Sequence, residues 1–360
     1  MTKRKPLTID GRTILSGESA DLHLEFSESY LGRPVSIPVS VFRASKTGPR
    51  VFLTGAIHGD ELTGIGIIRE LLFNQPPALR RGTLVCAPVV NIYGLEHHSR
   101  YLPDRRDLNR SFPGSPTGSL TSRLAHRVFT DIISQCDYGI DFHSAAVRRT
   151  NYPNVRADMT KPEVRRLARA FGCELIVNSK GPDDSLRRTA VLNGIPTIIL
   201  EAGEVWRIEQ GVVDIGVRGC LNVLKELNML DGEPDPPPYH LTIDKTVWVR
   251  AQRGGFLTFY ARPGDLVYEG EELATNYSIF GREKNVLTSP SFGVVLGMST
   301  MPAVQPGEPI YHIANLSERT YKRIKRIRSE SNLKDDPFQT MRDHFTVKVA
   351  VEDRRDNDVY

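Results

Sequence analysis

The chain has 360 residues, and its 39% hydrophobic and 25% charged content is ordinary for a globular protein of about two domains. The net charge of +4 comes from 47 basic and 43 acidic residues, which is weak support for a nucleic-acid partner. No apolar run approaches the ~18 residues that a membrane span needs. The basic N-terminal segment lacks the apolar core of a secretory signal. These features disfavour nucleic-acid-binding, membrane and secreted proteins.

The cysteines lie far apart and form no C-x-x-C pair: Cys86, Cys136, Cys173 and Cys220. Such spacing is typical of neither a disulfide framework nor a zinc ribbon. We therefore expect reduced, mostly buried thiols and a cytoplasmic protein.

The predicted elements begin with a β-hairpin extension in residues 1–50, built from two alternating segments, "ADLHLEFSES" and "PVSIPVSVFRA". Residues 51–232 then alternate apolar strand-like runs with amphipathic helical runs. This alternation predicts an α/β domain with a mixed, largely parallel sheet flanked by helices. Ligands of such sheets bind outside the carboxyl ends of the strands.

The composition and pattern of the sequence change after a proline-rich linker at 233–243, whose prolines cannot continue a helix. Residues 244–315 are rich in glycine, valine and aromatic residues, with short runs and no helical period. They predict a small β-barrel domain that covers the rim of the active site. Residues 316–360 are charged and poor in periodicity, so we expect a partly mobile tail.

Three residues of ligating type follow predicted strands. His58 and Glu61 stand in "VFLTGAIHGDELTG", and His143 ends the strand-like "YGIDFH". Two histidines and a glutamate are a known zinc set that leaves a fourth position open for water. The sequence therefore predicts one catalytic zinc ion per chain.

Chemistry at such a site needs a carboxylate that takes a proton from water, and Glu201 at the end of "IPTIILEAG" is the candidate. It also needs a cation or donor for the developing oxyanion. The segment "SRYLPDRRDLNRSFPG" offers Arg100, Asn109 and Arg110. Ser144 lacks the G-x-S-x-G context of a serine nucleophile.

Taken in order, "GAIHGDE", "RDLNRSFPG", "DFHS" and "IPTIILEAGE" resemble the aspartoacylase and succinylglutamate desuccinylase family. This family is a branch of the zinc-carboxypeptidase fold. The resemblance covers roughly residues 20–315, including the β-barrel of biotinyl/lipoyl-like type, and it is nearest the bacterial branch of N-acetyl-diaminobutyrate deacetylases. The motifs are specific as a set, although each one alone is weak.

The resemblance implies a role for each matching position. His58, Glu61 and His143 match the zinc ligands, and Glu201 matches the general base and acid. Asn109 and Arg110 match the pair that binds the substrate carboxylate. Arg100 resembles the arginine that polarises the scissile carbonyl, with Arg105 and Arg106 as competitors, because this stretch is longer than in the animal aspartoacylases.

The reaction that the resemblance implies is hydrolysis of a small N-acyl amino acid or related compound by metal-activated water. Two alternatives remain open from the residues: a carboxypeptidase or peptide-amidase acting on short peptides, and a zinc-containing binding protein without turnover. The acyl group and the amino acid have no readable code in the sequence.

Several smaller assignments also remain open. Arg187 is a candidate contact for a substrate carboxylate, with Arg188 as its competitor. Asp60 and Asp141 are candidates to orient a ligand histidine. Edge strands of the barrel leave a homo-oligomer open as a possibility.

Overall fold

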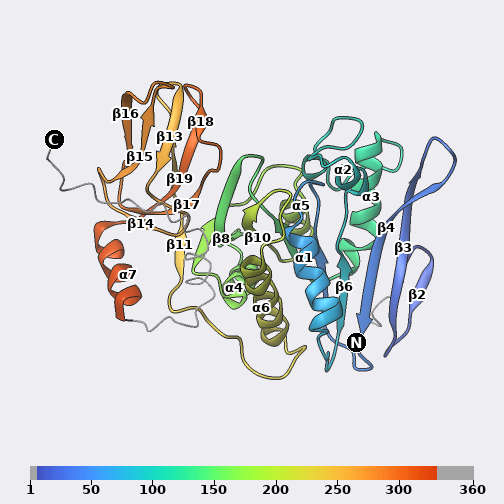
Figure 1. Cartoon of the computed structure of the whole chain (residues 1–360). Helices are drawn as coiled ribbons and strands as arrows, with labels where there is room; N and C mark the ends of the chain where they lie inside the picture. Colours follow the sequence, from blue (N-terminus) through green and yellow to red (C-terminus); the bar gives the residue numbers. More distant parts are fainter. Residues whose placement is uncertain (1–5, 331–360) are drawn as a thin grey trace, which may run out of the picture.

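The computed structural model describes residues 6–330, apart from the side chain of Lys284. Ten strands run in one path across a large sheet, in the order β12-β19-β17-β8-β10-β7-β5-β6-β4-β3. Within the predicted catalytic region, β6, β5, β7 and β10 are parallel to one another, and β8 is antiparallel to β10. The prediction of a mixed, largely parallel sheet flanked by helices is confirmed (Figure 1).

The strands of the catalytic region are short and mostly buried: β5 Arg50–Thr54, β6 Thr83–Ala87, β7 Tyr138–His143, β8 Arg149–Ala157, β9 Leu175–Asn178 and β10 Thr197–Glu204. Successive residues of one strand serve opposite faces. Val51 and Leu53 of β5 pack into one hydrophobic core, whereas Phe52 between them packs into another. The sheet is therefore covered on both sides, which explains why its strands read as continuous apolar runs.

Helices cover both faces: α1 Thr63–Arg69, α2 Ile92–Glu96, α3 Leu120–Asp131, α4 Pro162–Phe171, α5 Leu186–Leu192 and α6 Gln210–Glu226. Residues of α1, α4 and α6 belong to the first core, and residues of α3 and α5 belong to the second. Local signals set the ends of α4, because Pro162 opens it and Gly172 ends it in the left-handed conformation. None of the helices among the described residues is long and apolar enough to cross a membrane.

The N-terminal residues form two hairpins: β1 Leu7–Ile9 with β2 Arg12–Ile14, and β3 Ser19–Glu28 with β4 Pro34–Arg43. Strand β4 pairs antiparallel with β6, so the second hairpin extends the large sheet at one edge. The N-terminal region is thereby continuous with the catalytic region.

The C-terminal strands are antiparallel to one another, apart from β11, which pairs parallel with β9: β11 Leu241–Ile243, β12 Thr246–Arg250, β13 Gly255–Phe259, β14 Leu266–Val267, β15 Glu272–Tyr277, β16 Glu283–Thr288, β17 Gly293–Ser299, β18 Ala303–Val304 and β19 Pro309–Asn315. They enclose a separate hydrophobic core. Strand β17 also pairs with β8, so the two parts share one sheet. The boundaries predicted at residues 51, 232 and 244 stay predictions.

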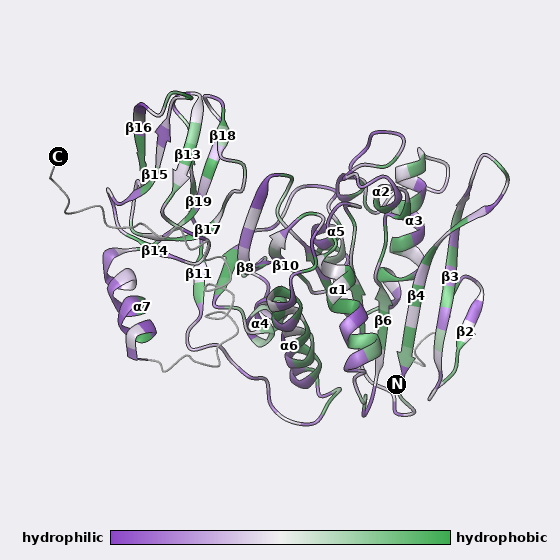
Figure 2. Cartoon of the chain, viewed as in Figure 1, coloured by the Kyte–Doolittle hydropathy of each residue, from purple (hydrophilic) through white to green (hydrophobic). Residues whose placement is uncertain are grey.

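The predicted charged tail begins with an ordered helix, α7, which spans Glu318–Glu330. Figure 2 colours most of this helix as hydrophilic, but Tyr321 and Ile324 are buried against the rest of the molecule. Three apart on a helix, these two side chains share one face. Because the segment is highly charged, its sequence pattern did not predict this narrow apolar face. The rest of the predicted tail, residues 331–360, lies outside the described residues.

Candidate metal centre

His58 and Glu61 lie in the turn that joins the central strand β5 to α1. Both side chains are buried, and Oε1 of Glu61 lies 2.6 Å from Nδ1 of His58. Gly59 between them packs directly on the backbone of α2, since a Cβ atom at this position would lie 1.9 Å from the carbonyl carbon of Gly94. The glycine of the "HGDE" motif thus allows the turn to approach α2 closely.

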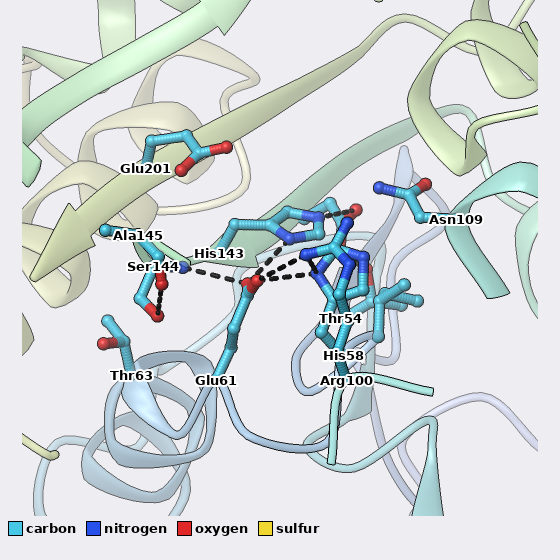
Figure 3. Close-up of polar contacts among 12 residues, drawn as sticks. Thr54, His58, Glu61, Thr63, Arg100, Asn109, His143, Ser144, Ala145 and Glu201 are labelled. Carbon is cyan, nitrogen blue, oxygen red and sulfur yellow. Dashed lines mark hydrogen bonds and ion pairs between the residues drawn. The ribbon is translucent and has the colours of Figure 1, made fainter. Parts of the chain in front are cut away.

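His143 ends β7, the strand beside β5, and its ring faces the same glutamate. Oε2 of Glu61 lies 2.9 Å from Nδ1 of His143 and also accepts a hydrogen bond from the backbone N–H of Ser144 (Figure 3). One donor atom from each of His58, Glu61 and His143 lies within 4.8 Å of the others. The structure therefore brings together the three predicted ligands, because parallel strands present their carboxyl ends at one edge of the sheet.

A carboxylate holds the far side of each histidine ring. Oδ2 of Asp141 lies 2.9 Å from Nε2 of His143, and Oδ1 of Asp107 lies 3.3 Å from Nε2 of His58. The hydroxyl of Thr54 donates to Asp141 and holds that carboxylate in place. Both rings thus direct Nδ1 toward Glu61, which is the carboxylate–histidine arrangement that orients metal ligands.

The opposite charges of Glu61 and the two histidine rings stabilise one another. Burial would raise the pKa of Glu61, but the nearby rings of His58 and His143 outweigh it and hold that pKa well below its usual range. Burial would lower the pKa of His143, but Asp141 and Glu61 outweigh it and raise that pKa well above its ordinary value. Glu61 is therefore held as an anion at the centre of the group.

The group is suited to a metal ion. It offers two imidazole nitrogens and a carboxylate, all buried and converging, with a carboxylate behind each ring. Three protein ligands of these types are the number and kind that a catalytic zinc site uses. Asp60, the other candidate for orienting a histidine, is buried but bonds neither ring, and one of its carboxylate oxygens has no hydrogen-bond partner among the described residues.

Glu201 lies next to His143 because β10 and β7 are parallel and pair these two residues in register. Paired residues on neighbouring strands direct their side chains to the same face of the sheet. The amide nitrogen of Asn151 donates to Oε2 of Glu201 at 3.1 Å, and Nη1 of Arg156 lies 3.4 Å from Oε1. The carboxylate is thus fixed at the rim of the metal-ligand group.

Among the competing arginines, Arg100 is the one at the centre. Its guanidinium lies 3.2 Å from Nδ1 of His58 and 3.5 Å from Oε1 of Glu61, and it donates to Asp107 at 2.9 Å. Arg105 and Arg106 are exposed and do not line the cavity. Asp107 therefore holds Arg100 and His58 together.

Asn109 and Arg110 line the same cavity, of about 360 Å³, as the metal-ligand group. The side-chain oxygen of Asn109 accepts a hydrogen bond from the backbone N–H of Leu186, which ties this segment to α5. No hydrogen bond of the described residues uses its side-chain nitrogen. Figure 3 shows Asn109 and Glu201 on either side of the metal-ligand group, so a small substrate can reach both.

Arg187 and Arg188 stand in the first turn of α5, but they differ in environment. Arg187 lines the cavity, and its Nη1 donates to the carbonyl of Ser179 at 2.6 Å. Arg188 pairs with Asp183 at 2.8 Å and does not line the cavity. The structure therefore brings Arg187, rather than its neighbour, to the site.

Several residues of the site were missed from the sequence. Asp107 stands in the quoted "RDLNRSFPG" motif, and its position two residues before Asn109, where it caps a short helical turn, was a readable signal. Arg149, Arg156, Trp248 and His312 also line the cavity. Trp248 and His312 come from the C-terminal strands, and no local pattern signals their presence.

Fold and site together define the class. An α/β sheet carries at its carboxyl edge a buried His–Glu–His group able to hold a metal ion, with a fixed carboxylate and arginines around one cavity. These are the parts of a hydrolase that attacks a carbonyl with water.

Comparison with known proteins gives the family. Residues 47–227 match the model of the succinylglutamate desuccinylase/aspartoacylase catalytic domain. An N-alpha-acetyl-L-2,4-diaminobutyric acid deacetylase from Halomonas elongata is 30% identical over 257 residues, which cover 68% of this chain and 75% of that protein. The chain therefore belongs to the succinylglutamate desuccinylase/aspartoacylase family, as the motifs predicted, and it is a hydrolytic deacylase of that family.

Solved structures agree on the fold. A succinylglutamate desuccinylase/aspartoacylase from Rhodobacter sphaeroides has a TM-score of 0.73 at 25% identity, over 83% of this chain and 96% of that one. A product-bound ectoine utilization protein from Ruegeria pomeroyi has a TM-score of 0.73 at 24% identity, over 83% of this chain and 95% of that one.

Proposed function

We propose that the protein is a zinc-dependent deacylase that hydrolyses the amide bond of a small N-acyl amino acid or a related compound. The observation that carries the proposal is the pairing of Glu201 with His143 in register, beside the group in which Glu61 joins both histidines. The match to a deacetylase of an acetylated amino acid supports the substrate class.

His58, Glu61 and His143 would hold one zinc ion per chain, and Asp107 and Asp141 would keep the two rings in orientation. Zinc in such a site activates water at neutral pH and polarises a carbonyl. The other residues of the site would bind and orient the substrate or transfer protons.

The proposed proton path runs through Glu201. Its carboxylate, held by Asn151 and Arg156, takes the proton of the attacking water and later gives it to the leaving amine nitrogen. Arg100, anchored by Asp107, donates to the carbonyl oxygen as negative charge develops there. Asn109 and Arg110 bind the carboxylate of the amino acid, and Arg187 adds positive charge to the same cavity.

Metal analysis followed by a substrate panel tests the proposal. We expect about one zinc per purified chain, and we expect loss of turnover to the background rate on chelation with recovery on addition of zinc. N-acetyl, N-succinyl and N-formyl amino acids should be hydrolysed, and dipeptides should not. Full turnover by metal-free protein, or a preference for dipeptides, would contradict the proposal.

The carboxylates behind the histidines give a second test. Asp141→Asn is expected to weaken zinc binding by about 10- to 100-fold, because the neutral amide no longer fixes and polarises the His143 ring. Competition with a chromogenic chelator measures the dissociation constant. Asp60→Asn makes the same change beside Glu61 at a side chain that bonds neither ring, and it should bind zinc within about threefold of the parent. Equal affinities of the two variants would show that Asp141 does not orient a ligand.

A further inference from the structure

The C-terminal strands reach the site through a row of register partners that crosses the large sheet. Trp248 of β12 is opposite His312 of β19, and their rings stack with centroids 4.3 Å apart, while the guanidinium of Arg149 lies 5.1 Å from the centroid of the Trp248 ring. His312 is in turn opposite Gly297 of β17, and Gly297 is opposite Asn151 of β8. Directly opposite residues point to the same face of a sheet. The row from Trp248 to Asn151 therefore forms one wall of the cavity, interrupted at Gly297, which has no side chain.

The side-chain amide of Asn151 fills this interruption in one defined orientation. Its nitrogen donates to Oε2 of Glu201 at 3.1 Å. Its oxygen lies over Gly297, since a Cβ atom on the glycine would lie 2.4 Å from Oδ1 of Asn151. The reversed amide would set its oxygen against the carboxylate, so that two acceptors faced each other. Asn151 can therefore bond Glu201 only while its oxygen occupies the space above the glycine.

The bond from Asn151 determines where one carboxylate oxygen of Glu201 lies. Within the described residues, no other hydrogen bond reaches Oε2, and the contact of Arg156 is to Oε1 at 3.4 Å. Loss of the Asn151 bond would leave Oε2 free to rotate away. A displacement of about 1 Å in a reacting group can cost about 10²-fold in rate, so this contact matters for proton transfer.

A purely structural reason for the glycine has to be separated from this one. A Cβ atom at Gly297 would also lie 2.7 Å from the carbonyl oxygen of Thr150, so crowding of the backbone alone favours glycine. Gly293 of the same strand is equally crowded, because a Cβ atom there would lie 2.4 Å from Cγ2 of Ile313 and 2.6 Å from the carbonyl oxygen of Ala314. Those neighbours belong to β19, and none of the three residues lines the cavity. The two glycines are thus a matched pair that differs in contact with Asn151.

We propose that strand β17 positions the proton-transfer carboxylate: Gly297 leaves the space in which the Asn151 amide lies, and Asn151 in turn holds Glu201 at the rim of the metal-ligand group. This inference rests on the proposed function, in which Glu201 takes and gives the proton. Asn151 and Gly297 are positioning residues that act through Glu201. The C-terminal strands are therefore part of the catalytic unit as well as a wall of its cavity.

Gly297→Ala and Gly293→Ala test the role of the glycine as a pair. Each adds one methyl group to β17 under similar crowding, so both should lower the melting temperature. Gly297→Ala alone should lower kcat, by about 10- to 100-fold, with KM within about twofold of the parent, because a displaced proton acceptor slows the reaction without weakening binding. Equal kcat values for the two variants overturn the role of Gly297.

Asn151→Ala removes the contact without crowding the strand, so it is informative even if Gly297→Ala does not fold. It should lower kcat by about 10-fold in the parent but by less than about twofold in Glu201→Gln, because the residue through which it acts is then already disabled. Asn151→Gln keeps a donor on a longer side chain and should recover part of kcat. Equal losses in both backgrounds, or a raised KM at the parent kcat, show that Asn151 acts on folding or on the substrate and overturn the inference.

A crystal structure of Gly297→Ala separates this inference from the proposed function. If Glu201→Gln keeps the parent kcat, the proposed proton path fails, and the crystal structure still shows whether β17 sets the carboxylate. A distance above about 3.5 Å between the amide nitrogen of Asn151 and Glu201, beyond hydrogen-bond range, supports the inference. An unchanged contact of 3.1 Å overturns it and leaves the deacylase function standing.

Discussion

Replacing Glu201 with glutamine is expected to lower kcat by about 10²- to 10⁴-fold, the usual contribution of general acid–base catalysis. Glutamine keeps the shape of the side chain and can still accept a hydrogen bond through its one amide oxygen from either Asn151 or Arg156, but it cannot take a proton from water. The zinc content should not change, because Glu201 is not one of the three grouped ligands.

Steady-state kinetics with metal analysis of the same preparation measures this effect. Glu204→Gln is the matched control, since Glu204 lies on the same strand but bonds Thr300 and does not line the cavity. That variant should turn over at the parent rate. A Glu201→Gln enzyme with the parent kcat would remove Glu201 from the proton path.

The second large effect is expected from Gly59→Ala, which lies inside the "HGDE" motif without contributing a ligand. The new methyl group would lie 1.9 Å from the carbonyl carbon of Gly94 and 2.2 Å from the backbone nitrogen of Leu95. Backbone atoms cannot yield as a flexible side chain can, so the turn and α2 must separate. We expect the free energy of unfolding to fall by about 3 kcal/mol, near the upper end for overpacking.

Denaturant unfolding measures this loss, and zinc titration shows whether the displaced turn still presents His58 and Glu61. Gly254→Ala is the matched control, because a methyl group there would first meet an atom at 3.4 Å, which is ordinary contact. Its unfolding midpoint should stay within error of the parent. A stable Gly59→Ala protein with unchanged zinc affinity would show that close approach to α2 is not required.

The second prediction concerns a short motif whose residues have different tasks. His58 and Glu61 carry two of the three candidate ligand atoms, whereas Gly59 lets the turn approach α2. The sequence spacing of the two ligand residues is therefore inseparable from the glycine between them. This explains how a turn of a few residues can hold two buried polar side chains against each other.

Much of the catalytic region was predictable because its signals are local. Continuous apolar runs such as Val51–Leu53 read as buried strands, and each predicted ligand follows or ends such a run. Parallel strands present their carboxyl ends at one edge, so sequence order alone placed His58, His143 and Glu201 together. The predicted assignment of Arg100 over Arg105 and Arg106 needed the structure, because all three lie in one irregular segment.

The least predictable residues are those supplied across the sheet. Arg149 reaches Trp248 only because β8 pairs with β17, which in turn pairs with β19 beside β12. Together these pairings bring Arg149 to Trp248, about a hundred residues later in the chain, and no local pattern specifies the partner of an antiparallel edge. Helix α7 was missed for a different reason, since its two buried side chains are a small part of a highly charged segment.

By itself, the sequence determined the chemical types present and the strand ends that carry them: two histidines, two glutamates and a run of arginines in a family order. Only the tertiary structure decided which carboxylate holds each histidine, which arginines face the cavity, and that Trp248 and His312 close it. The physical reason is the distance along the chain over which each property is determined. Residue type and strand termination are local properties, whereas the charge balance of a cavity depends on side chains that long-range strand pairing brings together.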